Sequence, residues 1–115
     1  MKYLCLIYDD EKNIMGMPKH ESETLMRDYG AFTEGIKASG HLLASHRLQP
    51  IHTASTVRVR NGKVSATDGP FAETKEQLGG FYQVDARDLN DAIQVASRIP
   101  SARYGSIEVR RIWEM

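Results

Sequence analysis

The hydrophobic and polar positions along this chain predict alternating strands and helices. Residues 2–8 form a predicted strand with apolar residues at both odd and even positions. Such a strand is typically covered on both faces of its sheet. Residues 9–19 follow as a predicted polar loop that contains Gly16 and Pro18.

Residues 21–39 form a predicted helix, because an apolar stripe repeats at helical spacing. The stripe consists of Leu25, Tyr29, Phe32 and Ile36. Gly40 stands where a left-handed C-cap is favoured. Gly30 and Gly35 weaken this helix by about 1 kcal/mol each relative to alanine, and close backbone packing against the sheet would be one reason to keep them.

The middle of the chain contains two further predicted strand regions. Residues 41–48 form a strand in which His46 shares a face with Leu42, Ala44 and Leu48. Residues 56–60 and 63–67 flank Asn61-Gly62, the strongest short signal for a β-hairpin. Residues 68–71 are a predicted turn, and residues 72–78 are polar with room for one helical turn.

The last third repeats the order strand, helix, strand. Residues 81–85 form a predicted strand after Gly79-Gly80, and Asp88 is the predicted N-cap of a helix. The predicted apolar stripe of this helix contains Leu89, Ala92, Ile93 and Ala96. Pro100 ends the helix, and residues 106–112 form the final strand.

The order of these elements predicts one α+β domain over residues 1–115. Without the hairpin it is the ferredoxin-like split βαβ arrangement, with two helices on one face of four antiparallel strands. The first strand is apolar on both sides, and no further element is left to cover the second face. We therefore expect a homodimer in which two sheets stack face to face.

Composition excludes several classes of protein. The 115 residues carry 15 basic and 15 acidic side chains, so the formal net charge is zero and gives no general attraction to nucleic acid or to a membrane. No apolar run approaches the ~20 residues that span a bilayer. The single cysteine, Cys5, cannot form an internal disulfide, which favours a cytoplasmic location.

Residues 67–82, TDGPFAETKEQLGGFY, resemble the DGPF-type branch of the YCII-related family. The resemblance extends to the opening YLCLIYDDE, to MRDYGAF, to DLNDAIQVASRIP and to the closing YGSIEVR. It implies a dimeric α+β barrel built on ferredoxin-like protomers. It also implies small-molecule chemistry based on a His–Asp pair, or an accessory role beside an extracytoplasmic-function sigma factor. The YCII branch places a histidine inside the first helix, whereas here only His20 lies near it.

Asp68 and His46 are the candidate catalytic pair. Asp68 is either a general base at the mouth of a cleft or an Asx-turn residue before Gly69-Pro70. His46 is either a proton-transfer group or a hydrogen-bonded core residue. If the two side chains meet, they form an acid–base dyad.

Four further residues are candidates for ligand binding. Arg58 lies on the predicted hairpin, where it could bind an anion or simply face solvent. Glu73 and Lys75 could line the same cleft as Asp68, and Tyr82 could present its hydroxyl to a ligand or pack in an interface. The spacing of the histidines and the cysteine predicts no metal site. The sequence also lacks the known nucleotide-binding motifs, so we expect no cofactor.

These observations leave two classes of function open. One is a small-molecule site, catalytic or only ligand-binding, near the Asp-Gly-Pro-Phe turn. The other is a non-catalytic module that associates with a sigma factor. A third class, an RNA-recognition module, shares the topology, but the chain lacks the basic aromatic motif of that fold.

Overall fold

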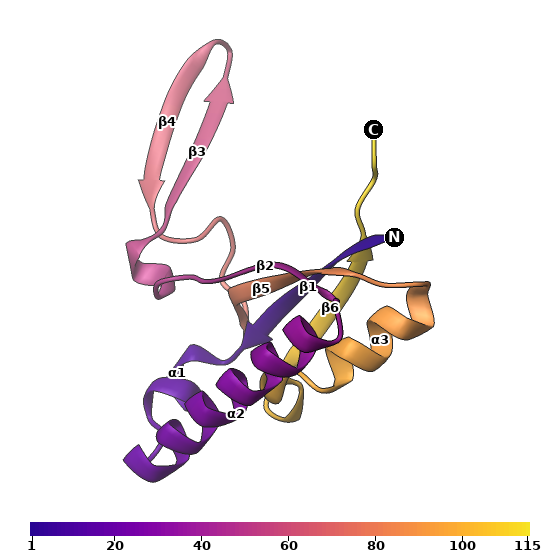
Figure 1. Cartoon of the computed structure of the whole chain (residues 1–115). Helices are drawn as coiled ribbons and strands as arrows, with labels where there is room; N and C mark the ends of the chain where they lie inside the picture. The colour runs from indigo at the N-terminus through magenta and orange to yellow at the C-terminus, as the bar shows by residue number, and fades with distance from the viewer.

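A computed structural model describes all 115 residues as a four-stranded sheet, a separate hairpin and a layer of helices (Figure 1). The strands are β1 (Lys2–Asp9), β2 (Leu42–Arg47), β3 (Ser55–Arg60), β4 (Lys63–Asp68), β5 (Gln77–Asp85) and β6 (Ser106–Arg111). The helices are α1 (Glu11–Met15), α2 (Lys19–Ala38) and α3 (Leu89–Ser97), with short 3-10 turns at Ile51–Thr53 and Pro100–Arg103. None of the helices has the length and apolar composition needed to cross a membrane.

The main sheet has the strand order β2-β5-β1-β6, and every neighbouring pair is antiparallel. Helices α2 and α3 lie on the same side of this sheet (Figure 1). This is the ferredoxin-like α+β arrangement that the order of elements predicted. The central strand β1 is paired on both sides, which places its carboxyl end beside the turn that leads into β6.

The core lies between this sheet and the two helices. Alternate residues of β1 and β5 point into it, as expected from the two-residue period of a strand. Its best buried members are Tyr3, Cys5, Ile36, Val84, Ala92, Val95 and Ile99. Burial raises the pKa of the Cys5 thiol to about 11, so this cysteine packs as a small apolar group.

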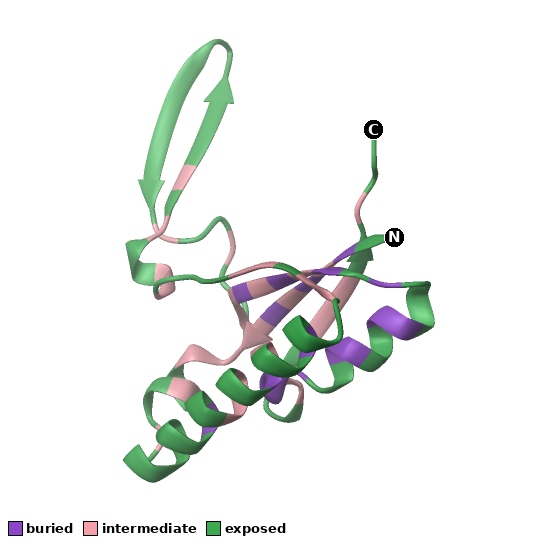
Figure 2. Cartoon of the chain, viewed as in Figure 1, coloured by how far each residue is buried: buried purple, intermediate pink, exposed green.

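The β3–β4 hairpin confirms the Asn-Gly prediction. Asn61 has a φ of 52° and Gly62 a φ of 73°, the two positive values that a type I′ turn requires. The hairpin does not pack on the sheet, and it projects from the body of the molecule (Figure 1). Nearly all of its residues are exposed (Figure 2).

Several local predictions are wrong. The segment predicted as a polar loop contains α1, which begins because the Asp10 side chain accepts a hydrogen bond from the Lys12 amide. Helix α2 begins at Lys19, so His20 lies in its first turn, and residues 72–76 contain no helical turn. A Cβ atom on Gly30 or Gly35 would meet nothing within 4 Å, so close packing does not explain these glycines.

The predicted faces of β2 and α3 are also partly wrong. A β-bulge between Leu42 and Ala44 changes the side to which β2 residues point. Leu42 packs against the core, whereas His46 lies opposite Phe81 on the other face. In α3 the side chains of Leu89 and Ile93 are exposed, and Val95 takes the buried position instead.

Candidate functional site

A cavity of about 280 Å³ opens between α2 and the sheet, at the end where β1 finishes. Its apolar lining comes from Ile7, Ile14, Leu25, Met26 and Phe81, and two tyrosines and two glycines complete much of the wall. Its polar lining comes from Asp9, Ser45, His46, Arg47 and Ser101. Cavities that bind small molecules combine an apolar wall with a few polar groups in this way.

Asp9 is the acidic group of this cavity. It is the last residue of β1, and its Oδ1 atom is buried without any hydrogen-bond partner. Burial raises the pKa of the Asp9 carboxyl, the Ser101 hydroxyl lowers it in part, and the nearby Glu76 adds to the rise. A carboxyl group with a raised pKa is better matched to proton transfer near neutral pH.

A chain of hydroxyl groups leads to this carboxyl. The Tyr29 hydroxyl donates to Ser101 Oγ at 2.5 Å, which leaves the Ser101 proton free for Asp9. Tyr29 comes from the middle of α2, and Ser101 from the 3-10 turn after α3. Burial is the largest cause of a raised Tyr29 pKa, and the Asp9 charge contributes to it, so this phenol keeps its proton. The hydrogen-bonded Tyr29–Ser101 pair therefore lines the same cavity as the Asp9 carboxyl.

Tyr82 forms the inner wall of the cavity. Its ring stacks on Tyr29 with 6.5 Å between centroids and meets Phe32 edge-on at 5.1 Å. Its hydroxyl is 2.7 Å from Thr33 Oγ1, and burial raises its pKa. The structure thus places this predicted ligand-binding residue beside the cavity, with 6% of its surface exposed.

Two consecutive glycines shape the sheet side of the cavity. A Cβ atom on Gly80 would lie 2.7 Å from the carbonyl oxygen of His46, so β2 can approach β5 closely only because residue 80 has no side chain. Gly79 also lines the wall, and a Cβ atom there would meet nothing within 4 Å. Gly80 therefore sets the close spacing of β2 and β5 at this wall, and Gly79 leaves open space beside it.

A second cavity of about 350 Å³ adjoins the first. Asp9, Ile14, Arg47 and Gly79 line both cavities. Glu11 lines the second one, where its Oε2 accepts a hydrogen bond from the Ile51 amide at 2.9 Å. Arg47 is exposed and forms no ion pair within the chain, so its guanidinium group is available to an anionic ligand.

The structure does not bring His46 and Asp68 together within one chain. The exposed His46 ring packs against Phe81, with 5.7 Å between centroids. Asp68 is exposed at the base of the hairpin, where Thr56 Oγ1 donates to the Gly69 carbonyl and Gly69 has a φ of 99°. No hydrogen bond joins the two predicted catalytic residues, and their catalytic role stays a prediction.

The other predicted ligand-binding residues lie away from the cavity. Arg58 is exposed on the hairpin, and Glu73 and Lys75 are exposed in the segment between β4 and β5. Their assignment to a site also stays a prediction. No three His, Cys, Asp or Glu side chains gather as a potential metal site.

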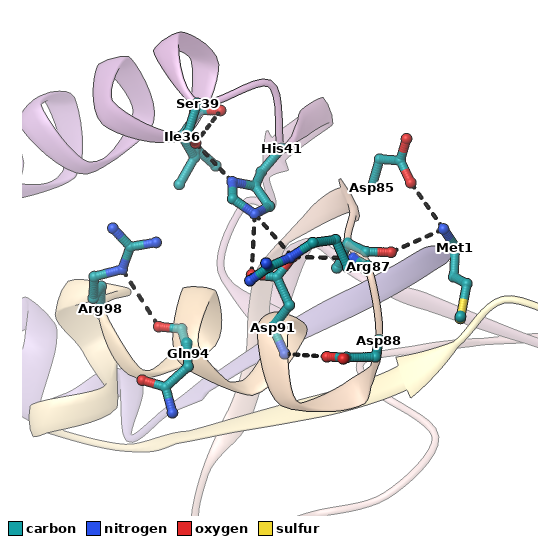
Figure 3. Close-up of polar contacts among 11 residues, drawn as sticks. Met1, Ile36, Ser39, His41, Asp85, Arg87, Asp88, Asp91, Gln94 and Arg98 are labelled. Carbon is teal, nitrogen blue, oxygen red and sulfur yellow. Dashed lines mark hydrogen bonds and ion pairs between the residues drawn. The ribbon is translucent and has the colours of Figure 1, made fainter.

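A second polar cluster lies near the opposite end of the sheet (Figure 3). His41 Nε2 is 3.2 Å from Asp91 Oδ2, and His41 Nδ1 is 2.6 Å from Ser39 Oγ. Asp91 also accepts from the backbone and the side chain of Arg87, and these hydrogen bonds lower its pKa to about 2. Asp91 is thus fully engaged inside the chain, and the cluster joins the start of α3 to the end of α2.

Sequence reasoning missed Asp9, Tyr29 and Ser101 as functional residues. Tyr29 was assigned to the core stripe, and Asp9 to a polar loop. One signal was present: Asp9 is the last residue of a strand that is buried at alternate positions, and strand ends often carry site residues. Tyr29 and Ser101 are 72 residues apart, so no local sequence pattern predicts their hydrogen bond.

Fold and site together define a small α+β domain with a cavity at one end of its sheet that contains one carboxyl group. The model of the YCII-related domain matches residues 1–115, and the chain belongs to this family. It is 41% identical over 112 residues to the uncharacterized protein R00369 of Rhizobium meliloti (strain 1021), a match that covers 96% of this chain and 90% of the relative. Assignment to the DGPF branch stays a prediction.

The fold is also similar to a solved structure. This is 5-chloro-2-hydroxyhydroquinone dehydrochlorinase (TftG) from Burkholderia phenoliruptrix AC1100, in complex with 2,5-dihydroxybenzoquinone. The TM-score is 0.57 at 14% sequence identity, and the match covers 99% of this chain and 94% of TftG. At this identity the likeness shows a shared fold.

Proposed function

We propose that this protein is an enzyme that transfers a proton to or from a small organic molecule bound in the Asp9 cavity. The observation that carries the proposal is the Asp9 carboxyl itself, which lines the cavity and has a buried oxygen without a partner. Buried polar atoms are almost always hydrogen-bonded, so an exception calls for a specific explanation. A catalytic carboxyl is one such explanation.

The surroundings of Asp9 suit general acid–base catalysis. Its pKa is raised by burial, which brings the carboxyl closer to the pH at which it can both accept and return a proton. Tyr29 and Ser101, which are hydrogen-bonded to each other, line the same cavity as Asp9 and supply hydroxyl groups beside it. By contrast, the Asp91 carboxylate has a lowered pKa and is fully engaged, so it is a poor base.

The lining indicates the class of substrate. A cavity of about 280 Å³ holds a molecule of about one or two rings, because an apolar cavity of ~150 Å³ already admits benzene. The rings of Tyr29 and Tyr82 favour an aromatic or otherwise planar molecule. Arg47, which borders both cavities, favours one that carries a carboxylate or phenolate.

The name of TftG supports a reaction of a small ring molecule on a protein of this fold. That protein is a dehydrochlorinase of a chlorinated hydroxyhydroquinone, and its structure holds 2,5-dihydroxybenzoquinone. Loss of hydrogen chloride requires removal of a proton by a base. Our proposal extends only the proton-transfer step to Asp9 of this chain.

Ligand mapping by NMR tests the proposal. Benzoate and 2,5-dihydroxybenzoquinone are titrated separately into the ¹⁵N-labelled protein. We expect saturable shifts in the amides of Ser45, Gly79 and Gly80, which line the cavity. The amides of Ser39 and His41 in the second polar cluster should not move.

Two variants separate binding from chemistry. Arg47→Gln should weaken binding of benzoate about tenfold, because it removes one charge-assisted contact. Asp9→Asn should still bind the probes but lose proton transfer, and Glu108→Gln on the far face of the sheet serves as the control. Probe binding that leaves the cavity amides unchanged, or that is unaffected by Arg47→Gln, would contradict the proposal.

The alternative function as a sigma-factor accessory receives no support from the family description or from the names of the relatives. We place the proposed activity in the cytoplasm, on the ground that the one cysteine is free and buried. Fractionation of cells that express a tagged chain tests this location.

A further inference from the structure

The second polar cluster contains a serine, a histidine and a carboxylate in one line of contacts (Figure 3). Ser39 Oγ lies 2.6 Å from His41 Nδ1. On the other side of the ring, His41 Nε2 lies 3.3 and 3.2 Å from the two carboxylate oxygens of Asp91. Nucleophilic catalysis by serine depends on such an arrangement, in which a base contacts the nucleophile and a third group holds the base.

The turn that ends α2 brings Ser39 and His41 together. Gly40 has a φ of 81°, the left-handed conformation that favours glycine. The Gly40 amide donates to the Lys37 carbonyl and the His41 amide to the Ile36 carbonyl, the two bonds of a Schellman motif. The Ser39 hydroxyl is also 3.2 Å from the Ile36 carbonyl, but its contact with the ring is shorter. The turn therefore holds the hydroxyl at Nδ1.

The Asp91 carboxylate decides which nitrogen of the His41 ring carries the proton. Hydrogen bonds from Arg87 hold the Asp91 pKa at about 2, so this group is ionised at neutral pH and only accepts hydrogen bonds. Nε2 must then donate to it, which leaves Nδ1 as the acceptor for the Ser39 hydroxyl. The His41 and Asp91 side chains are only 19% and 11% exposed, so neighbouring atoms hold the pair in place.

A surface hollow of about 460 Å³ opens onto the cluster. Ser39, His41 and Asp91 all line it, and so does Arg87, whose side chain is 86% exposed. Met1 and Ala86 are its apolar residues, so the wall offers little surface to a long acyl chain. A contact that merely ties α2 to α3 requires only His41 and Asp91, whereas the exposed serine hydroxyl adds a group that can react.

We propose that Ser39 is the nucleophile of a second, hydrolytic site that cleaves small esters of short-chain acids. Ser39 Oγ attacks the carbonyl carbon of the ester, and its proton passes to His41 Nδ1. The oxyanion that forms lies beside the Arg87 guanidinium group, which stabilises the negative charge. The bond from carbon to the leaving oxygen then breaks, the alcohol departs with the proton from Nδ1, and the acyl group stays on Ser39.

A water molecule completes the reaction. It attacks the acyl carbon and gives a proton to Nδ1, and that proton returns to Ser39 Oγ as the acid leaves. One ester and one water thus become one acid and one alcohol. Asp91 does not contact the ester; it is a positioning residue that fixes the ring and stabilises its protonated form. The site is independent of the proposed function, because no residue lines both this hollow and the Asp9 cavity.

Hydrolysis of p-nitrophenyl acetate by the full chain tests the proposal. We expect a burst of p-nitrophenol that is stoichiometric with the protein, and a fluorophosphonate probe should label Ser39, as located by peptide mass spectrometry. Ser39→Ala should lower the rate about a hundredfold and abolish the label. The matched control is Ser97→Ala, because Ser97 is an exposed helix-end serine that donates to a backbone carbonyl and contacts no histidine.

Asp91→Asn tests the positioning role. An asparagine amide can donate to Nε2, which moves the ring proton to Nδ1 and removes the acceptor for Ser39. The acylation rate should therefore fall at least about tenfold while KM is unchanged, whereas a purely structural role would leave the rate of the folded variant as it is. Acetyl groups on histidine or lysine only, an unlabelled Ser39, or equal rates in Ser39→Ala and wild type would each overturn the proposal.

Discussion

Asp9 is held in place by the absence of a side chain at Gly105. A Cβ atom on residue 105 would lie 2.8 Å from Asp9 Oδ1 and 2.0 Å from the carbonyl oxygen of Tyr8. The Gly105 amide donates to the Ser101 carbonyl at 2.8 Å, so the same residue also fixes the turn that carries Ser101. The unpartnered carboxyl oxygen and the hydroxyl next to it therefore depend on one glycine.

Gly105→Ala should damage both stability and ligand binding. The added methyl group collides with backbone atoms of β1, and forced overpacking costs about 1–3 kcal/mol. Chemical denaturation should show this loss, and binding of benzoate should weaken because the end of β1, which lines the cavity, is displaced. An alanine variant with wild-type stability and wild-type binding would show that Gly105 does not position the carboxyl.

Gly30→Ala and Gly35→Ala should have the opposite effect. Both glycines lie in α2, are exposed, and leave free space for a Cβ atom. Alanine favours the helix over glycine by up to about 1 kcal/mol per residue. We expect each change to raise the melting temperature by a few degrees without altering probe binding. A lower melting temperature would indicate a contact that the chain makes with a partner at this helix surface.

Asp9→Asn should stabilise the protein at neutral pH. Since burial raises the Asp9 pKa in the folded state, folding disfavours the ionised form. The wild type therefore has its full stability below the unfolded pKa and loses part of it as pH rises through the folded pKa. The gain from asparagine should be absent near pH 3 and present at pH 8, as measured by thermal unfolding. A gain that is the same at both values would contradict the assignment.

The pKa of Asp91 shifts in the opposite direction to that of Asp9. Its folded pKa is lowered to about 2 from 3.8, first by the hydrogen bond from the Arg87 backbone amide. Its contribution is complete above the unfolded pKa and is lost as pH falls through the folded value. Asp91→Asn should lower the free energy of unfolding at pH 7 and reduce its dependence on pH between about pH 4 and 2. An unchanged pH dependence in the variant would assign the loss of stability in acid to other carboxyl groups.

The sequence predicts the parts of this fold that depend on short-range patterns. The stripe from Leu25 to Ile36 identifies α2, and Asn61-Gly62 identifies the hairpin, because each signal lies within a few residues. The Asp88 cap is confirmed by its hydrogen bond from the Asp91 amide at 2.8 Å. These elements in order were enough to predict the split βαβ topology.

The site depends on contacts that no short-range pattern carries. One extra residue in β2, at Leu43, turned His46 to the face opposite the core. A bulge has no reliable signal in a run of apolar residues, since it is set by the fit between two strands. Likewise, Ser101 gains a role only because the turn after α3 lies against the end of β1 and α2.

The most direct test of the account is a ¹³C NMR titration of the Asp9 carboxyl, with the signal assigned by its loss in Asp9→Asn. We predict a pKa above the ordinary value of about 3.9 in the free protein, and a further rise when benzoate fills the cavity, because a bound anion disfavours a second negative charge. An Asp9 carboxyl that titrates at or below its ordinary value, and that does not respond to saturating benzoate, would contradict the claim that it is the proton-transfer group of a ligand site.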